Sequence, residues 1–197
     1  GKVDVLTLAP IFLPDNGIEN FCTLALEHNP NIRITVQEFW LPNDRFNAAN
    51  FREAHPVSDR NARSLAELRE QHAAYFASID EHVTNLNKKY GKTAVSVVPV
   101  GQAVLALREK IAAGEAPGLK VQTDLFTDVL GHATPQLQVL VAYCHYAVTY
   151  RRSPVGLPMP AALTRGKPTD PALLKLMQEL AWQAAIQHPL SGVKADK

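Results

Sequence analysis

Two carboxylates and an imidazole recur at intervals of four residues within one short segment. Asp124, Asp128 and His132 lie in the stretch 124–132, which also contains Gly131. A carboxylate beside an imidazole fixes the tautomer of the ring and stabilises its charged form, as in the base half of a nucleophilic triad. The spacing therefore predicts that His132 acts as a general base and that Asp128 orients it.

Other interpretations of this segment remain open. Asp128 could cap a helix while His132 is an ordinary surface residue. Asp124 competes for the orienting role, or joins the other two as a metal ligand, although a metal site needs further ligands that the sequence does not identify. His55, in a long loop, is an alternative base. The remaining candidates fall in helix-like segments, where structural roles are expected: His72, His82 and His145.

The sequence shows no nucleophile for this base. It contains neither a Gly-x-Ser-x-Gly nor a Gly-Asp-Ser pattern, which would hold a serine on a sharp turn. Cys22 and Cys144 fall in apolar, helix-like segments and are expected to be buried thiols. A Gly-rich phosphate loop is also absent.

Alternating strand-like and helix-like segments must position these residues. Apolar and β-branched runs predict strands at 3–8, 32–40 and 93–98. Apolar residues repeating every three or four positions predict helices at 18–28, 64–90, 102–113, 136–150 and 170–188. A strand–helix–strand order requires a right-handed crossover and a parallel pair. We therefore expect a three-layer, flavodoxin-like α/β fold with about three parallel strands.

The length of 197 residues and an apolar content of 46% suit a single domain with its own core. Residues 1–155 are expected to form the α/β core, and residues 156–197 a proline-rich connector and a helix packed on the same domain. Segment 41–61 has no clean period, and so long a loop in a compact domain is usually functional or mobile.

Polar and aromatic residues end two predicted strands, at the edge where a parallel sheet binds its ligands. Asp15 and Asn16 follow the first strand, either as a simple turn or as part of a site. Gln37 and Trp40 end the second strand. Gln37 could donate to an oxyanion or a sugar hydroxyl, and Trp40 could stack on a sugar ring. We predict binding roles for these four residues.

The order of these parts resembles the SGNH (GDSL-type) hydrolases over roughly residues 3–155. Segments 3–8 and 32–40 resemble the third and fourth strands of that family, and 96–103 resembles the fifth strand and its exit. Segment 125–132 is similar to the closing block, which supplies the family's Asp and His. The resemblance implies a serine-type ester hydrolase acting on a carbohydrate ester or another small acyl ester, with His132 as base and Asp128 orienting it.

The sequence departs from the family pattern at three points. The family's serine lies on its first strand, so we expect it in a segment ahead of Val3. The block Gly-x-Asn-Asp is replaced by Ala9-Pro10, and the closing block reads Asp-x-x-x-His, one residue longer than usual. Two other functions are therefore considered: a non-catalytic module that binds a glycan or a protein, and a metal-dependent enzyme using Asp124, Asp128 and His132.

The net charge and the hydropathy of the sequence limit the classes of partner that we expect the chain to bind. A formal net charge of +1 gives no electrostatic case for nucleic acid. No apolar run is long enough to span a membrane, and no cofactor is expected. A sheet of few strands leaves an edge unpaired, which invites association of one copy with another.

Overall fold

The chain folds around a parallel, three-stranded sheet with the order β1-β2-β3, which confirms the predicted α/β fold. The computed structural model describes residues 2–10, 13, 15–42, 44, 59–164 and 169–194. The strands are β1 (Val5–Leu8), β2 (Arg33–Glu38) and β3 (Val95–Pro99). The helices are α1 (Asn16–His28), α2 (Leu65–Tyr90), α3 (Val100–Ala112), the 3-10 turn η2 (Gln122–Leu125), α4 (Pro135–Tyr150), α5 (Ala161–Thr164) and α6 (Pro171–Gln187).

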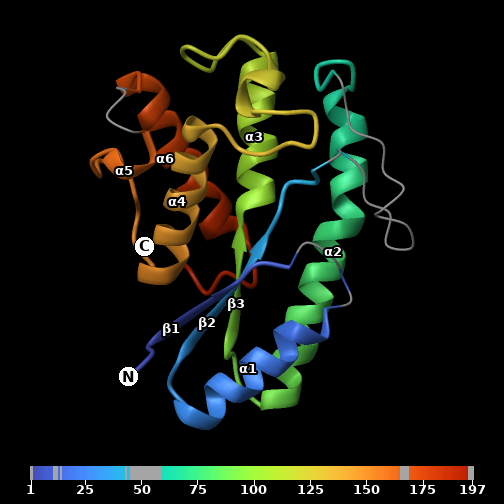
Figure 1. Cartoon of the computed structure of the whole chain (residues 1–197), viewed down its shortest axis with the longest axis vertical. Helices are drawn as coiled ribbons and strands as arrows, with labels where there is room; N and C mark the ends of the chain where they lie inside the picture. Colours follow the sequence, from blue (N-terminus) through green and yellow to red (C-terminus); the bar gives the residue numbers. More distant parts are fainter. Residues whose placement is uncertain are drawn as a thin grey trace.

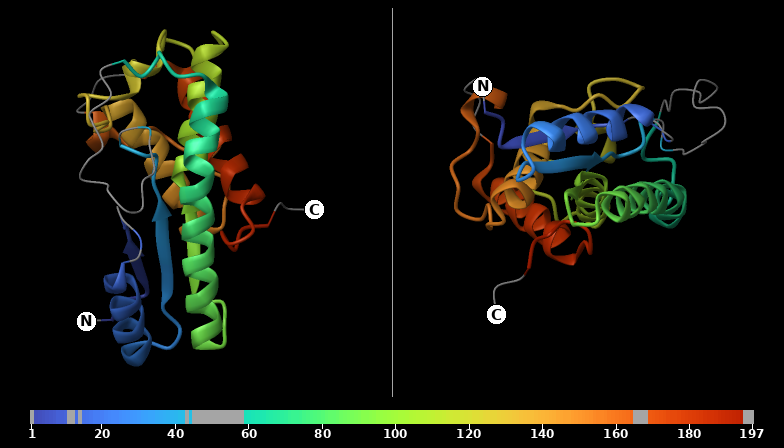
Figure 2. Two further views of the ribbon diagram at one scale, coloured as in Figure 1. Left: turned by 90° about the vertical axis from the view of Figure 1, so that its right-hand side faces the viewer. Right: turned by 90° about the horizontal axis from the view of Figure 1, so that it is seen from below.

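Helices cover both faces of the sheet (Figure 1). Helices α1 and α2 pack on one face, and α4 packs on the other with α6 against it. The long α2 runs beside the sheet over most of the length of the molecule (Figure 2). Helix α3 continues directly from β3, so it extends beyond the carboxyl ends of the strands (Figure 1).

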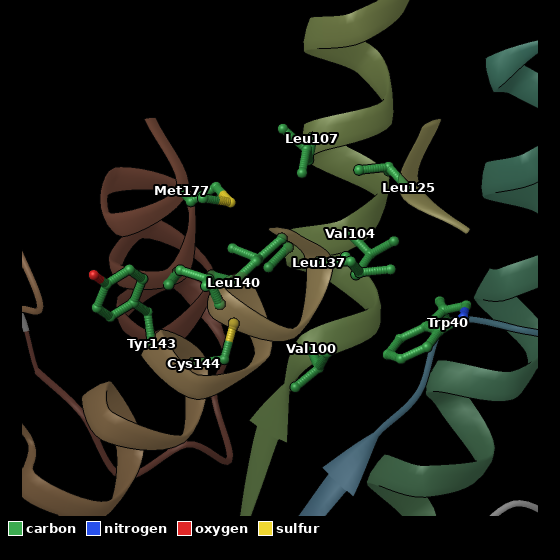
Figure 3. Packing of buried hydrophobic residues seen from close by; sticks show 14 of the residues in the cluster. Trp40, Val100, Val104, Leu107, Leu125, Leu137, Leu140, Tyr143, Cys144 and Met177 are labelled. Atoms are coloured by element: carbon green, nitrogen blue, oxygen red, sulfur yellow. The ribbon is translucent and has the colours of Figure 1, made fainter. Parts of the chain in front are cut away.

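Two apolar clusters hold these layers together. One lies between the sheet and α1 and α2, and includes Cys22, Ile34, Tyr75 and Val97. The other lies among α3, α4 and α6 (Figure 3). The members that Figure 3 labels are Trp40, Val100, Val104, Leu107, Leu125, Leu137, Leu140, Tyr143, Cys144 and Met177. Both cysteines are buried and free, as expected from their apolar surroundings.

The ends of α2 follow the predicted signals. The Ser64 hydroxyl accepts a hydrogen bond from the Glu67 main-chain N–H at 3.2 Å, and the Glu67 carboxylate accepts one from the Ser64 N–H at 2.9 Å. This reciprocal pair satisfies two main-chain donors that the first turn of a helix leaves unpaired. Gly91 ends the helix with a φ of 65°, a conformation that glycine adopts at little cost.

Helix α3 begins at Val100, two residues before the predicted start at Gln102. Its N-cap position, Pro99, makes no side-chain cap bond. The buried Glu38 at the end of β2 supplies one instead, because its carboxylate accepts the Gln102 main-chain N–H at 3.1 Å and the Gln102 amide at 3.0 Å. A side chain at Gly101 would meet the Phe39 carbonyl oxygen at 2.2 Å. Glycine there lets α3 approach β2.

The C-terminal segment joins the same body as the rest of the chain. Helix α6 packs against α4 and α3, and the Val97 N–H donates to the Leu190 carbonyl oxygen at 2.9 Å. Residues after α6 therefore cover part of the outer edge of β3. No helix in the described ranges is both long enough and apolar enough to cross a bilayer.

Sequence periodicity did not indicate η2 or α5, since each has only four residues and a run that short shows no helical repeat. Much of the loop 41–61 lies outside the described residues. His55, the alternative candidate base, is among the residues that the structure does not describe.

Candidate functional site

The predicted Asp/His segment forms a closed turn between η2 and α4. Phe126 and Ala133 form an isolated antiparallel bridge at its base. The Thr127 main-chain N–H donates to the His132 carbonyl oxygen at 2.8 Å. The two ends of the turn are therefore joined, and residues 127–132 project as one loop ahead of α4.

Asp128 and His132 form the hydrogen-bonded pair that their spacing predicts. The Asp128 Oδ2 atom lies 2.5 Å from His132 Nδ1. The other oxygen, Oδ1, accepts main-chain N–H bonds from Leu130 and Gly131 at 3.0 Å and from His132 at 3.2 Å. The hydrogen bond from the His132 ring, with help from these main-chain bonds, lowers the pKa of Asp128 to about 2. Asp128 is therefore a fixed anion at neutral pH.

An ionised Asp128 determines the tautomer of the neutral imidazole. A carboxylate only accepts hydrogen bonds, so Nδ1 of His132 must carry the proton. Nε2 then holds the lone pair of the ring. The His132 side chain is 72% exposed, so Nε2 is accessible to a reactant. This is the arrangement of a general base with its orienting acid.

Residues from distant elements hold the turn by its main chain. The Trp40 indole N–H donates to the Gly131 carbonyl oxygen at 3.0 Å, and Arg60 Nη2 donates to the Val129 carbonyl oxygen at 3.1 Å. The same Arg60 nitrogen also contacts the Pro42 carbonyl oxygen. These anchors restrict the turn from the protein side and leave the side chains of Asp128 and His132 exposed.

Gly131 is the residue that permits this close approach. Its φ is +98°, and an added Cβ would lie 2.5 Å from Arg60 Nη2 and 2.7 Å from the Pro42 carbonyl oxygen. Any other residue would be strained in its own backbone and would also push against the anchor. Gly131 therefore allows Arg60 and the Pro42 carbonyl to lie against the turn.

The anchoring arginine belongs to a buried ionic cluster. Asp44 and Arg108 are fully buried, and Arg60 is 1% exposed. Asp44 Oδ1 accepts from Arg60 at 3.1 Å and from Arg108 at 2.6 Å, and Oδ2 accepts from Arg108 at 3.0 Å. Arg108 Nε donates to Gln122 Oε1 at 2.7 Å. The Arg60 guanidinium also lies over the Phe126 ring, 4.2 Å from its centroid.

This cluster fixes the base of the turn from two sides. Phe126, at the start of the turn, stacks under Arg60, and Val129, within it, is bonded by the same side chain. Burial lowers the pKa of Arg60, and the negative charges of Asp44 and Asp128 oppose that shift. Arg60 therefore couples the buried cluster electrostatically to the exposed pair.

The predicted binding residues lie in other contacts. Gln37 is buried, and its Oε1 lies 2.7 Å from His145 Nε2, which joins β2 to α4. Asp15 caps α1 by accepting the Gly17 N–H at 2.8 Å, and Asn16 is the first residue of that helix. Trp40 is 9% exposed. To stack on a sugar, it would have to leave the position in which it holds Gly131.

Asp124 forms hydrogen bonds away from His132 and is not the residue that orients its ring. Its Oδ2 accepts the main-chain N–H groups of Lys120 and Val121 at 2.8 and 3.1 Å, which caps η2. Among the described residues, no group of three His, Cys, Asp or Glu side chains is placed to hold a metal ion. The structure thus joins Asp128, not Asp124, to His132.

Sequence patterns did not identify Asp44, Arg60 and Arg108 as residues that position the site. One signal was present, because Arg108 falls on the same helical stripe as Val104 and Ile111, both of which are buried. A charged residue on an apolar stripe requires a buried partner. Asp44 and Arg60 showed no comparable pattern.

No protein-family model, curated protein or solved structure matches this chain.

Proposed function

We propose that this chain carries the general base and the orienting acid of an ester hydrolase of the SGNH type. His132 is the base and Asp128 is the acid that orients it. The observation that carries the proposal is the 2.5 Å contact between Asp128 Oδ2 and His132 Nδ1, in a turn that Trp40 and Arg60 anchor by its main chain. That geometry leaves Nε2 of a neutral His132 free of the Asp128 contact, on a side chain that is 72% exposed.

The chemistry follows from the tautomer. Nε2 takes the proton of a hydroxyl as that oxygen attacks an ester carbonyl, and the imidazolium then returns the proton to the departing alcohol. Asp128 stays ionised throughout and stabilises the imidazolium. In the family that the sequence resembles, the hydroxyl belongs to a serine. No hydrogen bond in the described part of the chain joins a serine or a cysteine to His132.

The surroundings of the turn support a catalytic role over a simple surface pair. An exposed ion pair on a protein surface contributes little to stability, and nothing in folding requires one to be anchored by two buried side chains. Here Trp40 and Arg60 both hold the turn. Such support is what a catalytic group needs to keep its orientation. The substrate class, a carbohydrate ester or another small acyl ester, comes from the family resemblance.

Hydrolysis of short-chain nitrophenyl esters and of acetylated sugars tests the proposal. His132→Ala should lower kcat/KM by roughly 10²- to 10⁴-fold, the usual contribution of a general base. Asp128→Asn should also lower it, because the amide can donate to Nδ1 and so stabilise the unproductive tautomer. His28→Ala is the matched control, since His28 is exposed and, among the described residues, its ring bonds the Leu24 carbonyl oxygen of its own helix. Full activity in His132→Ala would refute the proposal.

Inactivity of the folded wild-type chain toward all of these esters has a different meaning. It would show that no hydroxyl of this chain works with His132, which a serine supplied from elsewhere and the non-catalytic binding module would both explain. Binding of acetylated and unmodified sugars, measured by calorimetry, would then distinguish a glycan-binding module from a chain that binds neither.

A further inference from the structure

A polar cavity lies at the amino-terminal end of the sheet, on the face that α4 covers. Helix α4 ends at Tyr150, partway along the strands, so the first residues of β2 and β3 extend beyond it (Figures 1 and 2). Arg33 Nη1 donates to the Thr149 carbonyl oxygen at 2.8 Å, which places the side chain of the first residue of β2 at the end of α4. A cavity of about 240 Å³ lies there, lined by residues of all three strands and of the last turn of α4.

Three cationic side chains line this cavity, those of Arg33, Lys92 and Arg151. Among the described residues that line it, none carries a carboxylate. Lys92 Nζ donates to the Pro30 carbonyl oxygen at 2.6 Å, and Arg33 to that of Thr149; these neutral acceptors leave both positive charges unbalanced. Within the described part of the chain, no ion pair involves any of the three cations. Positive charges gathered in a cleft without a counterion attract an anion.

The backbone of Arg151 adopts a conformation that is unfavourable for arginine. Arg151 is the C-cap residue of α4, with φ 53° and ψ 42°. Glycine usually takes this left-handed conformation at a helix end, because the Cβ of any other residue lies too close to the following carbonyl oxygen. No hydrogen bond from the Arg151 side chain to another described residue stabilises the arrangement. Strained residues of this kind cluster at binding sites, and here the strained residue brings a cation to the cavity.

Hydroxyl groups add uncharged donors to the cavity. Ser96 of β3, Thr93 ahead of that strand and Thr149 of α4 all line it. The Ser96 Oγ and the Arg151 Nη2 atoms lie 3.3 and 3.6 Å from the position that a Cβ on Gly192 would take. Both groups therefore lie close to one point, and an anion near that point is within reach of a hydroxyl and a guanidinium donor.

We propose that this cavity binds the phosphate group of a small phosphate monoester. Such a group carries about −1.5 to −2 charges at neutral pH and three acceptor oxygens, which suits three unbalanced cations better than the single charge of a carboxylate. A guanidinium binds phosphate through two parallel N–H bonds, and Lys92 adds a point charge. The cavity is smaller than the roughly 300–1,000 Å³ of pockets for drug-sized ligands, so the organic part of the ester is small.

This binding site is independent of the proposed hydrolase function. Arg33 is the first residue of β2, whereas Trp40, which holds the turn of His132, follows the other end of that strand. The strand alone spans roughly 17 Å at about 3.3 Å per residue. A small ligand at Arg33 therefore does not contact His132, and each proposal can fail without the other.

Calorimetric titration of the whole chain with inorganic phosphate and with glycerol 3-phosphate tests the proposal. The wild type should bind both with a Kd on the order of 1 mM or below. Arg151→Gln should weaken binding at least about tenfold, the usual contribution of a hydrogen bond to a charged group. Arg152→Gln is the matched control, because Arg152 is the adjacent, exposed arginine and does not line the cavity. Its affinity should stay within about twofold of the wild type, since an isolated surface charge contributes little.

Arg151→Gly separates binding from stability. Glycine adopts the left-handed backbone without strain, so this variant should unfold at a temperature no lower than the wild type and still lose phosphate binding. Nuclear magnetic resonance locates the site. Saturating phosphate should shift the amide signals of Thr93 and Ser96 in the wild type and leave that of His132 unchanged.

Three outcomes would overturn the proposal. The first is a folded wild type that shows no saturable binding of phosphate at concentrations about tenfold above the expected Kd. The second is equal weakening in Arg151→Gln and Arg152→Gln, which would mean that phosphate is attracted only by the general surface charge. The third concerns a lipid headgroup as the source of the phosphate: sedimentation with phosphatidylcholine vesicles containing phosphatidic acid, without binding of glycerol 3-phosphate, would exclude a small ligand.

Discussion

The Trp40 indole N–H donates to the carbonyl oxygen of Gly131, 91 residues further along the chain. Trp40 follows β2, and Gly131 lies between Asp128 and His132 in the turn ahead of α4. The end of a central strand thus holds the turn that presents His132. The position of the exposed pair depends on a contact made in the core.

Trp40→Phe tests this contact. The change keeps an aromatic ring but removes the only donor of the side chain, which leaves the buried Gly131 oxygen unpaired. We expect a loss of about 1–3 kcal/mol in the free energy of unfolding, the usual cost of an unsatisfied buried group. Urea unfolding measures it. Trp182→Phe, in a partly buried position on α6, is the control and should cost less.

Gly131→Ala tests the close approach of the turn to its anchor. Gly118 also has a positive φ, +77°, but nothing lies within 4 Å of an added Cβ there. Gly118→Ala should therefore cost only the backbone strain, about 1–2 kcal/mol. Gly131→Ala should cost at least about 1 kcal/mol more, because its Cβ would also displace Arg60 and the Pro42 carbonyl. Equal losses of unfolding free energy in the two variants would show that the packing against Arg60 is unimportant.

The sequence was sufficient for features whose parts are close along the chain. Asp128 and His132 are four residues apart, so one turn brings them together. The capping box of α2 is likewise contained in Ser64 and the next three residues. The number of strands and their parallel order also followed from the alternation of apolar runs and helical periods, because crossover connections have a fixed hand.

Features assembled from distant segments could not be predicted in this way. Asp44, Arg60 and Arg108 come from three separate parts of the chain, and no spacing rule links them. Trp40 was expected to face a ligand because it was placed at the end of a strand. Whether its N–H points outward or inward depends on where residue 131 lies in space, and a one-dimensional pattern contains no such information.

Asp44→Ala tests the buried cluster that supports the turn. The substitution leaves the Arg60 and Arg108 guanidinium groups buried without their carboxylate, so we expect a loss of about 3–5 kcal/mol in unfolding free energy. The control is Glu115→Gln, which disrupts the exposed pair of Glu115 and Lys110 and should change stability by less than about 1 kcal/mol. Thermal and urea unfolding measure both. Similar small effects in the two variants would contradict the structural role of the cluster.

His72 makes the stability of the fold depend on pH. Its Nδ1 lies 2.8 Å from the Leu68 carbonyl oxygen, and its Nε2 accepts the Leu41 main-chain N–H at 3.0 Å. The second contact requires a neutral ring, because a protonated Nε2 cannot accept a hydrogen bond, and burial lowers the pKa of His72 to about 4. In the unfolded chain the ring titrates near its ordinary value of about 6.5.

The sign of the effect follows from these two pKa values. Between about pH 6.5 and pH 4 the unfolded chain binds a proton that the folded chain does not, so stability falls as the pH is lowered through this window. The stabilisation is fully present above about pH 6.5. At about 1.4 kcal/mol per pH unit, the loss is on the order of 3 kcal/mol. Urea unfolding at a series of pH values should show this decrease in the wild type.

His72→Gln isolates the contribution of this ring from that of other titrating groups. The amide oxygen of glutamine can still accept the Leu41 N–H, but the side chain does not titrate. The variant should therefore be less stable than the wild type at neutral pH and should lose less stability on acidification to pH 4. Parallel curves for the two proteins would mean that His72 is not the group that links folding to protonation. A smaller decrease of unfolding free energy with falling pH in the variant would show that protonation of His72, on α2 beside Leu41, causes the pH dependence.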